Sequence, residues 1–367
     1  MAVRRQSLSP PNLPGYTYVR PLGSGGFADV FLYQQNMPRR MVAVKVLLTR
    51  IHDDAAARAF AAEADVMAGL SSHPAILTAY EASVAPDGRP FLVMEYCPSS
   101  MATRYRTEQI PIAEVLSIGV KVAGAVESAH RVGMLHRDIK PSNILVTSFG
   151  HPVLSDFGVA SATVTGEDDM IAMSPPWSAP EVVDRRSSGT VASEVWALAA
   201  TIYTLAAQHA PFDVPGGRRS DEQLRGRIMR AKFVPTGRAD APPAFDEALA
   251  NGLRRLPDDR YSSARKFGEA LQAVEREMGL PVTALELPDD AWAPTDYVDG
   301  ASGAPVHSTV SIQTQRQRVL DPLPRTGTHS RTGARRERLG RGIVIGMIIG
   351  GAAVIGVAVA AYLVLGR

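Results

Sequence analysis

Hydrophobic and polar positions follow two different periods along the first part of this chain. From Tyr16 onward they alternate as in strands, and further along apolar residues recur at helical spacing, as at Val115, Ile118 and Val122. The chain is therefore expected to contain both strands and helices. We expect strands at 16–30, 41–46, 91–97 and 144–146, helices at 54–70, 111–132 and 191–208, and two or three shorter helices after residue 212.

Both ends of the chain lack these periods. Residues 1–15 contain arginines and prolines but no apolar run, so we expect a disordered N-terminus and no secretory signal. Residues 280–341 are dominated by Pro, Ser, Thr, Gly, Asp and Arg, a composition typical of a disordered linker. The folded domain is therefore expected to span residues 16–279.

Residues 343–365 form an uncharged apolar run. As a helix this run would be roughly 35 Å long, which exceeds a bilayer core of about 30 Å. The alternative, a helix buried in a soluble domain, has no neighbouring folded segment to bury it. The run therefore predicts a single transmembrane helix. The arginines that precede it, with Glu337 as their one acidic neighbour, predict that the folded domain is cytoplasmic and that the C-terminal end lies outside. These arginines are Arg331, Arg335, Arg336, Arg338 and Arg341.

Composition narrows the class of protein. Of 367 residues 45% are hydrophobic, which is enough for a sizeable core, and a net charge of +2 gives no reason to expect a nucleic-acid partner. The single cysteine, Cys97, excludes an internal disulfide and fits a reducing compartment. The eight histidines never pair at metal-binding spacing.

The strongest chemical signal is the segment 136–143, His-Arg-Asp-Ile-Lys-Pro-Ser-Asn, which Asp156-Phe157-Gly158 follows after a short strand. An acid, an amine and an amide at fixed offsets in one loop suit phosphoryl transfer from a metal-bound nucleotide. Asp138 can orient a hydroxyl and accept its proton, while Lys140 can steady the charge of the transferred group. Asn143 and Asp156 offer the oxygen ligands that Mg²⁺ prefers.

These motifs resemble those of the Hanks-type protein kinases, and most closely the bacterial transmembrane serine/threonine kinases, over roughly residues 16–278. The resemblance implies an α+β fold, the bilobal protein-kinase fold, with a β-rich N-lobe at 16–95 and a helical C-lobe at 98–279. It also implies ATP with Mg²⁺, or Mn²⁺, and serine and threonine hydroxyls of proteins as substrates. His136 is then a packed residue that supports the catalytic loop.

The resemblance also assigns the nucleotide site. A glycine-rich hairpin covers the phosphates, Lys45 holds them and Glu63 holds Lys45, while Met94 is the gatekeeper and the backbone of Glu95 and Cys97 contacts adenine. From the residues alone, the hairpin could be a simple turn, the lysine an unpaired surface residue and Cys97 a small core residue. The implied site comprises Leu22, Gly23, Ser24, Gly25, Gly26, Val30, Ala43, Lys45, Glu63, Met94, Glu95, Cys97 and Asp156, with Asn143 and Asp156 as metal ligands and Asp138, Lys140 and Asn143 as catalytic residues.

The same resemblance implies candidate phosphorylation sites and a buried structural ion pair. Arg137 is expected to place a buried or half-buried guanidinium beside Asp138, where a phosphothreonine at Thr163 or Thr165 would pair with it. Ser174 matches the hydroxyl residue that contacts the catalytic acid and lysine. Glu181 and Arg260 match a buried structural ion pair. Linker threonines such as Thr309 and Thr314 are candidate sites for forkhead-associated, phosphothreonine-binding partners; the alternative for each threonine is an unmodified residue.

Three departures from the family pattern leave other functions open. Ala28 replaces a glycine, Pro175-Pro176 replaces a threonine-proline pattern, and Glu194 replaces an aspartate, so that its bonds to the catalytic loop are expected to be displaced or water-bridged. These departures favour a pseudokinase scaffold as the alternative, with a small-molecule phosphotransferase third. Gly346 and Gly350 have the spacing of closely packed membrane helices, which suggests a homodimer.

Overall fold

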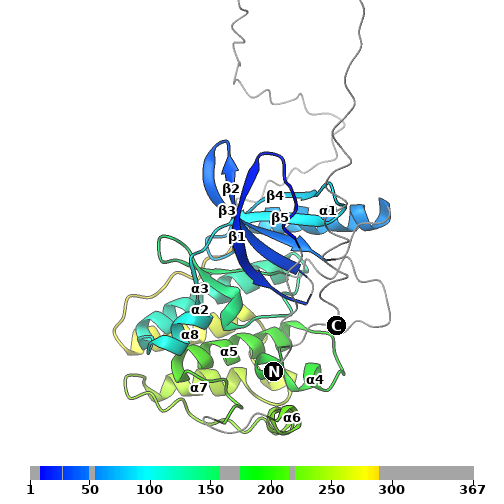
Figure 1. Cartoon of the computed structure of the whole chain (residues 1–367). Helices are drawn as coiled ribbons and strands as arrows, with labels where there is room; N and C mark the ends of the chain where they lie inside the picture. Colours follow the sequence, from blue (N-terminus) through cyan, green and yellow to red (C-terminus); the bar gives the residue numbers. More distant parts are fainter. Residues whose placement is uncertain (1–8, 27, 49–53, 158–173, 215–219, 289–367) are drawn as a thin grey trace, which may run out of the picture. The chain divides into compact units, whose positions relative to one another are not determined.

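The computed structural model describes residues 9–26, 28–48, 54–157, 174–214 and 220–288 (Figure 1). All of them lie in the compact unit formed by residues 1–298. The strands are β1 (Tyr16–Ser24), β2 (Ala28–Asn36), β3 (Arg39–Leu47), β4 (Ala79–Val84), β5 (Pro90–Glu95), β6 (Ser99–Ser100), β7 (Ile144–Val146) and β8 (Pro152–Leu154). The helices are α1 (Asp54–Leu70), α2 (Met101–Thr107), α3 (Ile112–Arg131), α4 (Pro180–Val183), α5 (Val191–Ala207), α6 (Asp221–Arg230), α7 (Pro243–Gly252) and α8 (Ala264–Glu277), with short 3-10 turns at Pro141–Asn143, Pro175–Trp177 and Pro257–Asp259.

The N-lobe is an antiparallel five-stranded sheet in the order β1-β2-β3-β5-β4. The two faces of β3 pack into different hydrophobic clusters, because successive side chains of a strand point to opposite sides. Val42, Val44 and Val46 belong to one hydrophobic cluster, while Ala43 and Leu47 belong to the larger cluster that continues into the C-lobe. The second face is therefore the one turned toward the catalytic elements.

The prediction of a disordered N-terminus is corrected for residues 9–15. Leu13 is only 2% exposed and completes the smaller hydrophobic cluster of the sheet. The Tyr33 hydroxyl donates to the Pro11 carbonyl at 2.6 Å, and Arg89 Nη2 donates to the Ser9 carbonyl at 2.9 Å. One leucine and a few carbonyl groups suffice to hold this segment, although it has no period that sequence reasoning could detect.

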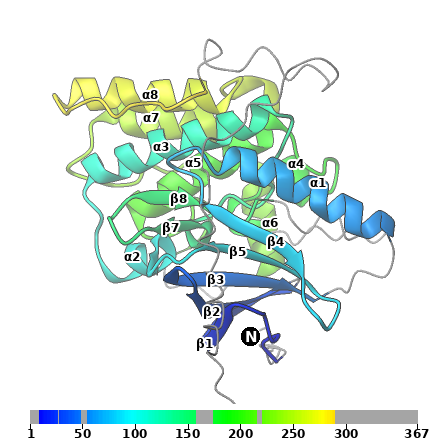
Figure 2. The same ribbon diagram turned by 90° about the horizontal axis from the view of Figure 1, so that it is seen from above.

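The C-lobe is built around α3, α5 and α8, which lie together in Figure 2. Helix α5 begins at a capping box in which the Thr190 hydroxyl accepts from Ser193 N and the Ser193 hydroxyl accepts from Thr190 N. Gly119 of α3 lets α8 approach closely, since a Cβ there would lie 2.5 Å from Leu271 Cδ1. In the described residues after 212, where two or three shorter helices were expected, the structure has α6, α7 and α8.

The linker predicted from residue 280 is corrected for residues 280–288, which pack on the C-lobe without forming a helix or strand. Leu280 and Leu285 contact the hydrophobic core, and Thr283 bonds to Glu275 of α8. Figure 2 shows this segment in yellow, running back along α8.

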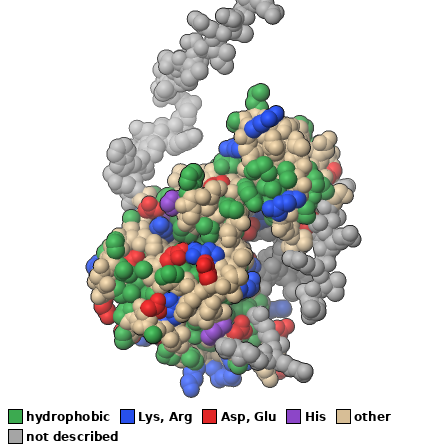
Figure 3. Space-filling model, turned by 60° about the vertical axis from the view of Figure 1, so that its left-hand side comes forward, with side chains coloured by type: hydrophobic (Ala, Val, Ile, Leu, Met, Phe, Trp, Pro, Cys, Tyr) green, Lys and Arg blue, Asp and Glu red, His purple; other side chains and the backbone are tan. Residues whose placement is uncertain are grey.

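Other sequence predictions fall on residues outside the described ranges. These are Gly158, Thr163, Thr165, Thr309, Thr314 and the apolar run 343–365. Among the helices that the structure describes, none has the length and hydrophobicity needed to cross a membrane. On the face shown in Figure 3, acidic and basic side chains are intermixed.

Candidate active site

Two residues of the candidate site have an unusual backbone conformation, Arg137 in the catalytic loop between α3 and β7 and Asp156 just after β8. Arg137 has φ 65° and Asp156 has φ 63°, both in the left-handed region that non-glycine residues seldom adopt. Each such residue costs on the order of 1–3 kcal/mol and persists only where its surroundings enforce it. Two of them at sequence-predicted site positions indicate a backbone shaped for function.

His136 supports the catalytic loop through buried contacts. The ring is 1% exposed and lies 4.6 Å from the ring of Phe157. Its Nδ1 accepts from the Asp138 amide at 3.2 Å, so Nε2 carries the proton and donates to the Ser155 carbonyl at 2.8 Å. His136 therefore joins the two segments that carry Asp138 and Asp156, which confirms its predicted packing role.

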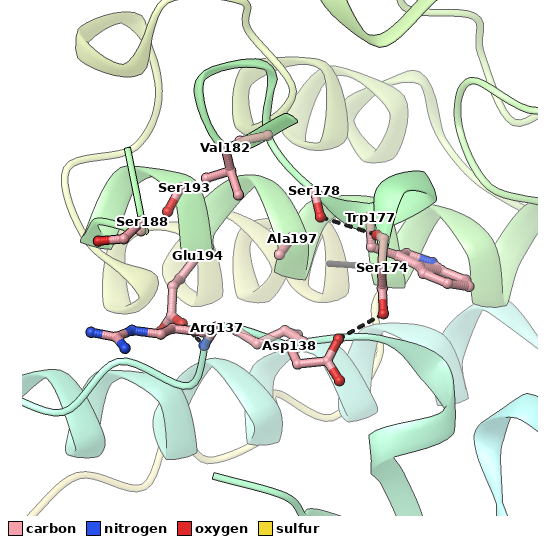
Figure 4. Close-up of a pocket in the computed structure, with 13 residues that line it drawn as sticks. Arg137, Asp138, Ser174, Trp177, Ser178, Val182, Ser188, Ser193, Glu194 and Ala197 are labelled. Atoms are coloured by element: carbon pink, nitrogen blue, oxygen red, sulfur yellow. Dashed lines mark hydrogen bonds between the residues drawn. The ribbon is translucent and has the colours of Figure 1, made fainter. Parts of the chain in front are cut away.

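Asp138, Lys140 and Ser174 form a closed triangle of hydrogen bonds. The Ser174 hydroxyl donates to Asp138 Oδ1 at 2.8 Å, and Lys140 Nζ donates to Asp138 Oδ2 at 2.6 Å and to Ser174 Oγ at 2.9 Å. Figure 4 shows the Ser174 hydroxyl pointing at the carboxylate. The Asp138 carboxylate can thus accept a hydrogen bond from a hydroxyl while the Lys140 ammonium lies beside both groups. This is the geometry that proton transfer from a hydroxyl to a carboxylate requires.

Asn143 completes this loop. Its Nδ2 donates to the Asp138 carbonyl at 2.8 Å and to Asp138 Oδ2 at 3.1 Å, which fixes the orientation of the amide. The amide oxygen Oδ1 then has only a weak described contact, with the Ser142 hydroxyl at 3.3 Å. This oxygen and the Asp156 carboxylate are a hard donor pair that fits Mg²⁺, which takes the rest of its ligands from water and phosphate. No group of three His, Cys, Asp or Glu residues in the described ranges could hold a metal.

Lys45 reaches across to Asp156. Its Nζ lies 2.7 Å from Asp156 Oδ1, and the two side chains are 13% and 40% exposed. Partial withdrawal from water raises the pKa of the Asp156 carboxyl, but Lys45, aided by His136 and Lys140, outweighs it and holds the pKa below its ordinary value. Lys45 is therefore a paired residue of the site. The Glu63 side chain, its predicted partner, lies outside what the structure describes.

The strand register brings the predicted nucleotide residues together. Gly23 lies opposite Val30, Val30 opposite Lys45, and Ala43 opposite Met94. The Gly25 amide donates to the Ala28 carbonyl at 2.9 Å, so the alanine that replaces the family glycine still closes the hairpin. A small cavity behind these strands is lined by Lys45, Met67, Leu77, Ala79, Leu92, Met94, Asp156 and Phe157.

The segment after β5 has the features expected of a hinge. The Glu95 amide donates to the Thr78 carbonyl at 2.9 Å, which orders the strand end. Cys97 is half-buried, and burial, with a smaller effect from Glu95, raises the pKa of its thiol to about 12. The thiol therefore has little thiolate character at neutral pH, which agrees with the interpretation of Cys97 as a small core residue.

Glu194 bonds directly to the catalytic loop, contrary to the displaced or water-bridged arrangement that we expected. Its Oε1 accepts from the Arg137 amide at 2.5 Å, and Oε2 lies 2.6 Å from His130 Nε2. Both side chains are buried, with 3% and 6% exposed. The extra methylene of Glu194 is accommodated, and His130, which sequence reasoning missed, is its partner from the last turn of α3.

The Arg137 side chain differs from its prediction. It is exposed rather than buried, and Figure 4 shows it pointing away from Asp138. The left-handed backbone at this residue turns the guanidinium outward while the amide turns toward Glu194. Beside it lies a pocket that includes Asp138, Ser174, Trp177 and Val182 in its lining.

Glu181 and Arg260 form the predicted clamp. Arg260 Nη1 and Nη2 donate to the two Glu181 oxygens at 2.7 and 2.8 Å. The Arg260 guanidinium also lies over the Trp196 ring, 4.9 Å from its centre. This pair fixes the segment that begins at Ser174 to the body of the C-lobe.

A β-rich lobe and a helical lobe that meet at Lys45, Asp138 and Asp156 define a nucleotide-dependent phosphotransferase site. The model of the protein kinase domain family matches residues 16–272. This chain belongs to the protein kinase domain family, as its motifs predicted.

Curated relatives and a solved structure agree with this family assignment. Serine/threonine-protein kinase PknK of Mycobacterium tuberculosis is 40% identical over 294 residues, which cover 76% of this chain and 26% of PknK. The chain therefore spans about a quarter of that relative's length. Serine/threonine-protein kinase PknL of the same organism is 32% identical over 282 residues, covering 74% of this chain and 69% of PknL. The crystal structure of the PknI kinase domain from M. tuberculosis matches with a TM-score of 0.52 and 29% identity, covering 73% of this chain and 99% of that domain.

Proposed function

We propose that this chain is a membrane-anchored serine/threonine protein kinase that transfers the γ-phosphoryl group of ATP to proteins, itself included. The observation that carries the proposal is the triangle of Asp138, Lys140 and Ser174, in which a hydroxyl already donates to the carboxylate at 2.8 Å. The two relatives PknK and PknL, both named as serine/threonine-protein kinases, support the choice of substrate class. The side chains expected for catalysis are all present in the loop.

In the proposed reaction, a substrate serine or threonine hydroxyl occupies the side of Asp138 that faces Ser174. The hydroxyl oxygen forms a bond to the γ-phosphorus, the bond from that phosphorus to the β,γ-bridging oxygen breaks, and the proton passes to Asp138. ADP leaves with the bridging oxygen. Lys140 stabilises the charge on the transferred group, and Lys45 holds the remaining phosphates.

Mg²⁺ or Mn²⁺ would be held by the Asn143 amide oxygen and the Asp156 carboxylate. When bound, the metal neutralises charge on the phosphates. The lowered pKa of Asp156 keeps the carboxylate ionised for that task at neutral pH. Asn143 also donates to Asp138, so one side chain orients the acid while offering its oxygen to the metal.

The substrate class is tested by incubating the full chain with labelled ATP, Mg²⁺ and a generic protein acceptor, followed by phosphoamino acid analysis. The expected label is on serine and threonine and not on tyrosine. Bound nucleotide without any transferred label would favour the pseudokinase scaffold instead. Mapping of the labelled residues would show whether Thr163 and Thr165 are phosphorylated.

The proposed membrane anchor rests on the apolar run 343–365 and the arginines before it. The kinase domain would then be cytoplasmic, and Gly346 and Gly350 would allow two spanning helices to pack as a dimer. Phosphorylated linker threonines would recruit forkhead-associated domains. The chain should resist alkaline extraction from membranes, a variant that lacks 343–365 should not, and Gly350→Leu should weaken dimerisation in a membrane association assay.

A further inference from the structure

The segment 280–288, called the strap below, is fixed to α8 by hydrogen bonds, two of them to the buried carboxylate of Glu275. Glu275, which is 1% exposed, accepts from Thr283 N at 2.8 Å and from Thr283 Oγ1 at 2.6 Å. Gln272 Nε2 donates to the Thr283 carbonyl at 2.8 Å, and Leu285 packs on the core. Because buried polar groups that lose their partners cost free energy, these bonds hold the strap in one register.

Two helical glycines make room for the strap. A Cβ at Gly124 of α3 would lie 2.6 Å from the Glu286 carbonyl oxygen, and a Cβ at Gly268 of α8 would lie 2.7 Å from Leu285 Cδ1. Glycine inside a helix costs about 1 kcal/mol relative to alanine. The close approach of the strap explains why glycine occupies both helical positions, since any larger residue would collide with the strap.

The far end of the strap bonds to the turn that follows α1. His73, in this turn, is 9% exposed, and its Nδ1 accepts from the Ala75 amide at 3.0 Å. Nε2 therefore carries the proton and donates to the Glu286 carbonyl at 3.0 Å. One neutral histidine thus satisfies both contacts and joins the strap to the turn.

The same turn is bonded to the strand that leads to Asp156. The Leu154 amide donates to the Ala75 carbonyl at 2.8 Å, and the Leu77 amide donates to the Leu154 carbonyl at 2.9 Å. Asp156 follows Leu154 by two residues in the sequence. A continuous series of contacts therefore runs from the strap through His73 to the carboxylate that pairs with Lys45.

We propose that the strap is a positioning element for the nucleotide site and that His73 is the residue through which it acts. By holding the turn after α1, the strap sets the position of the strand end that bears Asp156. The proposal rests on the proposed kinase function. It gives the residues that follow α8 a role in nucleotide binding. Whatever engages the tail can then alter nucleotide affinity through this contact.

The test uses the full chain with two variants that break the contact from opposite sides. Gly124→Ala pushes the Glu286 carbonyl away while favouring the helix. His73→Asn keeps an acceptor for the Ala75 amide but is too short to reach Glu286. His73→Gln retains a donor near the position of Nε2 and should restore the contact. Gly226→Ala on α6 is the matched glycine control, since a Cβ there meets nothing closer than Arg230 Nη1 at 3.6 Å.

We expect Gly124→Ala and His73→Asn to raise the KM for MgATP about three- to tenfold with kcat changed less than about twofold, the range typical of coupling through packed networks. Amide hydrogen exchange of residues 71–79 should become faster in both. His73→Gln and Gly226→Ala should stay near wild type.

Wild-type KM and exchange in both contact-breaking variants would overturn the proposal. If the wild-type chain transfers no phosphate at all, titration with a non-hydrolysable ATP analogue takes the place of KM. That titration and the exchange measurement then decide the role of the strap separately from the kinase function.

Discussion

Replacing Arg260 with methionine removes the positive half of a buried ion pair. The Arg260 and Glu181 side chains are 0% and 11% exposed. Besides its two bonds to Glu181, the guanidinium donates to the carbonyls of Arg254, Ala192 and Arg255 at 2.8, 3.0 and 3.1 Å. Methionine fills most of the volume but offers no donor, so Glu181 keeps a buried charge without a partner.

Removing one partner of a buried pair costs about 3–5 kcal/mol, and we expect a loss of that size in the free energy of unfolding for Arg260→Met. The loss would be a large fraction of a typical stability of about 5–15 kcal/mol. Arg260→Lys should recover only a small part, because one ammonium cannot serve two carboxylate oxygens and three carbonyls with the geometry of a guanidinium.

Urea unfolding followed by tryptophan fluorescence measures these losses, since Trp196 packs under the guanidinium. Arg265→Met is the matched control. The Arg265 and Glu269 side chains are 50% and 33% exposed, and the loss of such a surface pair should cost no more than about 1 kcal/mol. A loss for Arg260→Met as small as that of the control would refute the reasoning.

Three further outcomes are expected. Glu194→Ala leaves the half-buried Arg137 amide without its acceptor, so kcat should fall at least about tenfold while nucleotide affinity, measured by analogue titration, stays within about twofold. An unchanged kcat would contradict the role of Glu194. The Cys97 thiol, with a pKa of about 12, should react with iodoacetamide at pH 8 about a thousandfold more slowly than an ordinary thiol, and fast labelling of the folded protein would show that burial does not protect it. The pKa of Asp156 is lowered by Lys45, so their pair stabilises the fold above pH ~4 and is lost as the pH falls through the lowered folded value. The stability difference between wild type and Lys45→Met should therefore shrink between pH 6 and pH 3 in urea unfolding, and an equal difference at both pH values would count against the pair.

The catalytic loop could be predicted from sequence because its chemistry is local. Asp138, Lys140 and Asn143 lie within six residues of one another, and the structure brings them into one hydrogen-bonded group. The predicted bounds of α1 match the observed ones, while those of α3 differ by one residue at each end and those of α5 by one residue at the C-terminal end. These helices could be predicted because their apolar spacing is long and regular.

The remaining features depend on contacts between distant segments. The N-terminal segment buries Leu13, and the strap packs Leu280 and Leu285 on the core, but neither segment has an apolar period that the sequence could reveal. Strand β6 and helix α2 were also not predicted, because two and seven residues are too short to show a clear apolar period. A glycine inside a helical pattern, as at Gly124, was the available signal of a close approach, but it does not identify which segment approaches.

The direction of the Arg137 side chain also escaped sequence reasoning, since it depends on a left-handed backbone that Glu194 and His130 hold from two other helices. A substitution of aspartate by glutamate looks disruptive in the sequence alone. In the structure the longer side chain spans both partners, so this departure gives no support to a pseudokinase.

The most direct test of the central claim is phosphoryl transfer by the wild-type chain and by Asp138→Asn, measured with labelled ATP and Mg²⁺ alongside nucleotide affinity. We predict label on serine or threonine in the wild type and a loss of at least about a hundredfold in Asp138→Asn, because the acceptor of the hydroxyl proton is gone while the nucleotide contacts remain. Equal transfer by both proteins, or no transfer by a wild-type chain that binds nucleotide, would contradict the account.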